Sequence, residues 1–125
     1  MNESFQPQPE HKFTEKISPF RNGGDFERPG FDGQILVDGS ENRGFSSLII
    51  QVHGEHPPKR MLEDTTRTYF VLEGSGSFTL DGIRKTVEKG ELVVIEPDGE
   101  YQYEGEMSLL ETNISATNIF KELKL

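Results

Sequence analysis

Arg60, Arg67 and the three tyrosines of the chain are of the types that bind anions and ring-shaped ligands. Arg60 and Arg67 carry planar guanidinium groups, which match the geometry of a carboxylate or a phosphate. Each tyrosine combines an apolar ring with a hydroxyl that can complete a hydrogen bond. We therefore expect a site for a small anionic or sugar-like ligand. Its candidate residues are Gln51, Arg60, Arg67, Tyr69, Tyr101 and Tyr103.

Arg67 also has a purely structural interpretation. Its guanidinium can pair with a nearby carboxylate, for which Glu63, Asp64 and Glu73 are the candidates. Structural ion pairs fill interior sites as readily as functional ones do. The sequence leaves both roles open, a ligand contact and an internal ion pair.

The histidines offer a different chemistry. His53 and His56 stand three residues apart near several carboxylates, which is a pattern to test for a displaced divalent metal. Residues three apart on a strand project to opposite faces, so only a turn at Gly54 would bring both imidazoles together. We expect His56 to be exposed in a turn before Pro57 and Pro58, and if any metal binds, these two histidines are its candidate ligands.

Composition excludes several functional classes. The chain has no cysteine, so it has no disulfide and no thiolate metal site. Its net charge of −9, from 22 acidic and 13 basic residues, argues against a nucleic-acid partner. Apolar runs of only a few residues argue against a membrane span or a secretion signal. We expect a cytoplasmic protein with no membrane partner.

The elements that position these residues are short strands. Residues 68–95 read as four strands separated by glycine turns, and Asp81-Gly82 is a strong hairpin signal. Evenly spaced short strands favour an all-β barrel or sandwich. Residues 1–30 are polar and lack periodicity, so we expect a flexible arm there, partly disordered or packed on the barrel, and one barrel domain over 31–125. Ile119, Phe120 and Leu123 have helical spacing after Asn118, which predicts a short C-terminal helix.

Four glycines, Gly54, Gly74, Gly90 and Gly105, match the glycine positions of the two sequence motifs of the cupin family, over roughly half of the chain. The chain therefore resembles a small single-domain cupin. The resemblance implies the cupin double-stranded β-helix, an RmlC-like jelly-roll barrel. It also implies four metal-ligand positions, and these hold Arg60, Leu62, Arg67 and Tyr101.

Those four residues do not form a metal site. Arginine is a fixed cation without a lone pair, and leucine has no donor atom. Arg67 in place of a glutamate would repel a divalent cation. We expect no cofactor at the usual cupin position, while a displaced divalent metal is left open.

Strand alternation predicts which side chains face the interior. If Arg67 points inward, period two sends Tyr69 inward and Phe70 outward. Tyr101 and Tyr103 then face inward together, and Gln51 and His53 contribute from the preceding strand. Outward Phe70 and Leu72 would suit a second sheet or a partner subunit, and we expect a homodimer.

Three functional hypotheses follow from these residues. The first is a metal-independent binding module for a small anionic or sugar-like ligand. The second is an enzyme: the resemblance to cupin-like sugar epimerases would make His53 the base and Tyr101 or Tyr69 the acid, or a metal would act through His53 and His56. The third is a structural or interaction protein with a filled barrel.

Overall fold

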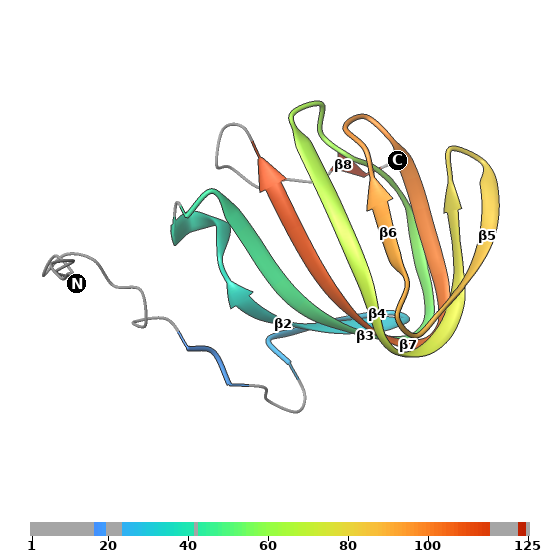
Figure 1. Cartoon of the computed structure of the whole chain (residues 1–125), viewed down its shortest axis with the longest axis horizontal. Coiled ribbons are helices and arrows are strands. Elements are labelled where there is room, and N and C mark those ends of the chain that lie inside the picture. Colours follow the sequence, from blue (N-terminus) through green and yellow to red (C-terminus); the bar gives the residue numbers. More distant parts are fainter. Residues whose placement is uncertain (1–16, 20–23, 42, 116–122, 125) are drawn as a thin grey trace, which may run out of the picture.

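The computed structural model describes residues 17–19, 24–41, 43–115 and 123–124 (Figure 1). Most of the described residues belong to strands, and one short 3-10 helix, η1, spans Gly39–Glu41. The strands are β1 (Phe26–Arg28), β2 (Phe31–Val37), β3 (Phe45–Arg60), β4 (Thr65–Leu80), β5 (Ile83–Glu88), β6 (Leu92–Ile95), β7 (Glu100–Ser115) and β8 (Leu123–Lys124).

All pairings between these strands are antiparallel. The order across the sheet is β1-β2-β3-β7-β4-β5, and β6 and β8 add to β4 and β3. Three long strands of 16 residues each, β3, β7 and β4, lie side by side and curve together through the molecule (Figure 1). The expectation of an all-β architecture is confirmed.

The long strands approach most closely at a row of glycines. Gly105 in β7 pairs with Gly54 in β3 on one side and with Gly76 in β4 on the other. Its φ of +144° favours glycine, and a Cβ there would lie 2.6 Å from the Gly76 Cα. The row therefore lets the sheet bend where it wraps around the interior.

The interior is filled from alternate positions of the strands, as the period of a strand requires. Tyr69 and Val71 are buried, whereas Phe70 between them is 37% exposed. On the outer face, Phe70 pairs with Leu92 of β6, which is also exposed. The homodimer expected from the sequence stays a prediction.

Described segments on both sides of the long strands contact the barrel. β1, in the expected arm, pairs with β2, and Ser18 Oγ donates a 2.8 Å hydrogen bond to the Leu36 carbonyl. Most of the expected C-terminal helix, at residues 116–122, lies outside the described residues. Leu123 forms strand β8 with Lys124 and pairs with β3, so the helical expectation is wrong there. Within the described ranges, no helix is long and apolar enough to cross a membrane.

Candidate functional site

A cavity of about 200 Å³ opens into the barrel beside Arg67 and His56. Strands β1, β2, β3, β4 and β7 all contribute to its wall. Four of its polar side chains are buried, while Arg28 at its mouth is exposed. The lining residues are Phe26, Arg28, Phe31, Leu48, Ile50, His56, Lys59, Arg67, Tyr69 and Glu111.

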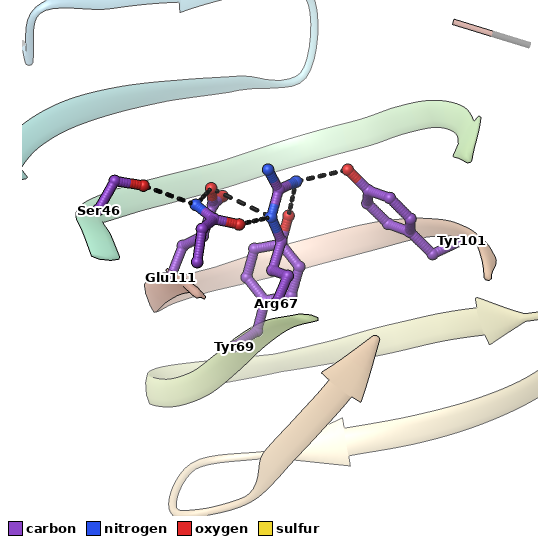
Figure 2. Close-up of polar contacts among 6 residues, drawn as sticks. Ser46, Arg67, Tyr69, Tyr101 and Glu111 are labelled. Carbon is purple, nitrogen blue, oxygen red and sulfur yellow. Dashed lines mark hydrogen bonds and ion pairs between the residues drawn. The ribbon is translucent and has the colours of Figure 1, made fainter. Parts of the chain in front are cut away.

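Arg67 is the centre of a buried hydrogen-bond network (Figure 2). Its Nη1 donates to the hydroxyls of Tyr69 at 3.1 Å and Tyr101 at 2.5 Å. Its Nε donates to Asn113 Oδ1 and lies 3.3 Å from Glu111 Oε2. The side chains of Arg67 and Glu111 are only 6% and 7% exposed, so this is an interior ion pair.

Asn113 holds the carboxylate in place. Its Nδ2 donates to Glu111 Oε2 at 2.8 Å and to Ser46 Oγ at 3.1 Å (Figure 2). The structure therefore pairs Arg67 with Glu111, on β7, a carboxylate far from it in sequence. An anionic ligand would have to compete with Glu111 for this guanidinium.

His56 lies inside the barrel, and the expectation that it is exposed in a turn is wrong. It is 5% exposed, and its ring stacks on Tyr103 with centroids 4.4 Å apart. β3 continues through Pro57 and Pro58 because both lie in a bulge, where a proline removes no ladder hydrogen bond. His56 Nδ1 is 2.7 Å from the Pro57 carbonyl, which only accepts. Nδ1 therefore carries a proton, and when the ring is neutral its lone pair is on Nε2.

All three tyrosines of the chain lie in this interior. Burial raises the pKa of Tyr69 well above its usual value of 10.0, and the Arg67 charge opposes this only in part. Burial likewise raises the pKa of Tyr103, with the Glu111 charge adding to it and a hydrogen bond to Tyr69 opposing it. These two phenols therefore stay protonated at neutral pH and can donate hydrogen bonds or a proton.

Arg60 was expected in the cavity but lies on the rim. Its side chain is 41% exposed and pairs with Glu100 at 2.5 Å. The bulge explains the difference: three steps along β3, from His56 to Lys59, match two steps along β7, from Tyr103 to Tyr101. One extra residue reverses the alternation, so Lys59 shares the inward face of Tyr101 and Arg60 does not.

Gln51 and His53 were also expected to reach the cavity, and both lie on the outer face. They flank Val52, which is buried, so period two turns them outward. Gln51 Oε1 accepts a 2.5 Å hydrogen bond from Ser108. The His53 side chain is 52% exposed, and its Nε2 is 3.8 Å from Asp32 Oδ2.

A displaced metal would need His53 and His56 together, but they lie on opposite faces of β3. Within the part of the chain that the structure describes, no group of three or more His, Cys, Asp and Glu residues is placed to hold a metal ion. Tyr69, Tyr101, Tyr103 and Arg67 do come together, as alternation predicted. Their role toward a ligand stays a prediction.

Three residues have interior roles that were not predicted from the sequence: Glu111, Asn113 and Lys59. For the first two a signal was present. Tyr101, Tyr103, Glu111 and Asn113 are all odd-numbered positions of one strand, and all are buried. The inward position of Lys59 depends on the bulge. The only sign of that bulge in the sequence is the pair of prolines, Pro57 and Pro58.

No protein-family model matches the sequence, and no curated protein is similar to it. Among solved structures, the Streptomyces nucleoside dehydratase Pac13 matches with a TM-score of 0.68 and 22% identity, over 80% of this chain and 82% of that chain. The Cnp3 cupin domain of Schizosaccharomyces pombe matches with a TM-score of 0.65 and 15% identity, over 76% and 71%. Ectoine synthase from P. lautus matches with a TM-score of 0.64 and 12% identity, over 73% and 68%. At these identities the likeness concerns the fold.

Three of the Pac13 structures contain uridine, and each carries one substitution. In one of them a histidine is replaced by glutamine, and in the other two a tyrosine is replaced by phenylalanine. The histidine and the first tyrosine are 13 positions apart in the Pac13 sequence, and the two tyrosines are 34 positions apart.

Proposed function

The protein is a small single-domain barrel of the cupin fold, and from this we propose that it is a metal-independent enzyme that removes water from a hydroxylated, sugar-like substrate such as a nucleoside. The observation that carries the proposal is the position of His56. The imidazole of His56 lies inside a cavity whose wall also holds the phenol of Tyr69, and it stacks on Tyr103. A base next to proton donors is what an elimination requires.

The intervals between these residues support the proposal. His56 and Tyr69 are 13 residues apart, and Tyr69 and Tyr103 are 34 apart. The same two intervals separate the substituted histidine and tyrosines of Pac13. The resemblance to cupin-like sugar epimerases points to His53 as the base, but the position that these intervals favour is His56, which faces the interior.

The chemistry follows from the protonation states. His56 Nε2 takes a proton from a carbon next to a carbonyl of the substrate, and that electron pair forms a carbon–carbon double bond. The hydroxyl on the next carbon leaves as water, with a proton supplied by the Tyr69 phenol. The proton on His56 then restores Tyr69, so the reaction is redox-neutral and consumes no cofactor. The Arg67 Nη1–H donated to the Tyr69 hydroxyl stabilises the phenolate that forms in between.

The two other hypotheses draw less support from the site. The anion-binding module predicted from the sequence relies on Arg67 and Arg60, and each is paired with a carboxylate, Glu111 or Glu100. A filled barrel would leave no cavity of about 200 Å³ beside His56. Because ligand pockets usually exceed about 300 Å³, the cavity suits a small ligand or one end of a larger one.

The test is a search for loss of water with a matched pair of histidine variants. Purified protein is incubated with sugars, uronates and nucleosides that carry a carbonyl next to a C–H bond, and mass spectrometry detects products lighter by one water. We expect wild type and His53→Gln to form the product and His56→Gln to lose it. Equal turnover in His56→Gln, with the fold intact, would refute the assignment.

A further inference from the structure

The cavity lies next to a larger groove on the outside of the barrel, and the two share part of their lining. The groove has a volume of about 780 Å³. Arg28, Phe31 and Lys59 line both hollows and therefore mark the boundary between them. The groove is lined by Arg28, Pro29, Gly30, Phe31, His53, Gly54, Glu55, Pro57, Pro58 and Lys59.

A tight turn fixes Arg28 at this boundary. Arg28 pairs with Phe31 across Pro29 and Gly30, and Gly30 has a φ of +89°, as a turn with proline followed by glycine requires. A Cβ on Gly30 would lie 2.3 Å from the Glu55 carbonyl oxygen, so the turn packs directly on the backbone of β3. The guanidinium of Arg28 extends from this turn over the ring of Phe26, at 5.2 Å.

The second cation reaches the boundary from β3. The bulge at Pro57 and Pro58 turns Lys59 inward, opposite Tyr101. The prolines have no N–H, so these two residues offer a ligand no backbone donor. The groove is also lined by Glu55 and His53, neither of which lines the cavity.

We propose that Arg28 and Lys59 form an anion subsite at the mouth of the cavity. The substrate carries a phosphate or carboxylate, which these two cations bind, while its hydroxylated part enters the cavity toward His56. This inference rests on the proposed function and narrows its substrate class to acids and phosphate esters. In a chain with a net charge of −9, a local pair of cations at a cavity mouth is where an anionic ligand is attracted.

The subsite is tested by binding of three matched probes, measured by calorimetry: uridine, uridine 5′-monophosphate and uridine 5′-carboxylate. We expect wild type to bind at least one anionic probe about tenfold more tightly than uridine, with an advantage that shrinks as salt is added. The double variant Arg28→Ala/Lys59→Ala loses this advantage and keeps its affinity for uridine. The tighter of the two anionic probes identifies the group.

The control is Lys85→Ala/Lys89→Ala, which changes the net charge equally at exposed positions that line neither hollow. We expect it to keep the advantage of the anionic probes. The subsite is refuted, and the proposed function stands, if uridine binds but neither anionic probe binds more tightly. The same holds if the control variant loses as much of the affinity advantage as Arg28→Ala/Lys59→Ala does. If no probe binds, the nucleoside-like substrate class fails and the subsite with it.

Discussion

The imidazole of His56 lies on the phenol ring of Tyr103, with centroids 4.4 Å apart and 26° between the ring planes. The ring of Tyr101 is stacked with the same imidazole at 5.5 Å. Together with the contact between Nδ1 and the Pro57 carbonyl, these neighbours fix both the plane and the tautomer of the ring. A base held in this way loses little side-chain entropy when a substrate binds.

Tyr103→Phe should distinguish the contribution of the Tyr103 ring from that of its hydroxyl. The substitution keeps the stacking on His56 but removes a buried hydrogen bond to Tyr69, so we expect a stability loss of only about 1 kcal/mol. We expect kcat to fall about 10- to 100-fold, because the proton donors are no longer linked. Urea unfolding and kcat are measured for Tyr103→Phe and for Tyr103→Leu, which removes the ring as well as the hydroxyl. Unchanged kcat in the phenylalanine variant would rule out a role for the hydroxyl.

The interior ion pair should show strong coupling. Arg67→Met leaves the carboxylate of Glu111 buried without its cation, and we expect a loss of about 3–5 kcal/mol in the free energy of unfolding. In Arg67→Met/Glu111→Leu both charges are gone, and we expect much of that loss to be recovered. Denaturant unfolding of the two single variants and the double variant measures the coupling. Simply additive losses would mean that the pair does not act as a unit.

Alkaline pH should destabilise the fold through two tyrosines. Because the pKa values of Tyr69 and Tyr103 are raised in the folded state, the folded protein holds these protons after the unfolded chain has released them. Their contribution is constant below pH 10.0 and is lost as pH rises above it, by up to about 1.4 kcal/mol per pH unit for each tyrosine. The free energy of unfolding, measured from pH 9 to 12, should fall less steeply with pH in Tyr69→Phe/Tyr103→Phe than in wild type. An equal slope in both proteins would contradict the prediction.

Two glycine substitutions should differ sharply in cost. A Cβ on Gly105 would lie 2.6 Å from both the Gly76 Cα and the Ser75 carbonyl oxygen, so Gly105→Ala must displace backbone, and we expect a loss of more than about 3 kcal/mol. Gly90 also has a positive φ, of +92°, but no atom lies within 4 Å of its added Cβ. Gly90→Ala should therefore cost only about 1 kcal/mol of conformational strain. Thermal unfolding compares the two, and similar costs would show that the glycine row is not what limits the bend.

Alternation predicted the part of the site that lies on uninterrupted strands. From Arg67 it placed Tyr69 inside and Phe70 outside, and from Tyr101 it placed Tyr103 inside. The same parity extends past Gly105 to Glu111, so the carboxylate of the ion pair was within reach of this reasoning.

The rest of the site depended on features that a single strand pattern does not contain. Proximity in sequence predicts a partner for Arg67 among the neighbouring carboxylates. The sheet register instead places Arg67 opposite Asn113, whose side chain is hydrogen-bonded to Glu111. The bulge at Pro57 exchanges the roles of Lys59 and Arg60. Its prolines resembled a turn, and for that reason the buried histidine was assigned to the surface.

The gathering of every tyrosine in one interior also gives the protein an optical property. The chain has three tyrosines and no tryptophan, and all three phenols belong to the cluster around Arg67 and His56. Its near-ultraviolet fluorescence therefore comes from the candidate site, without a background from other positions of the fold. A ligand that enters the barrel should change that emission directly, so the unlabelled protein can report its own occupancy.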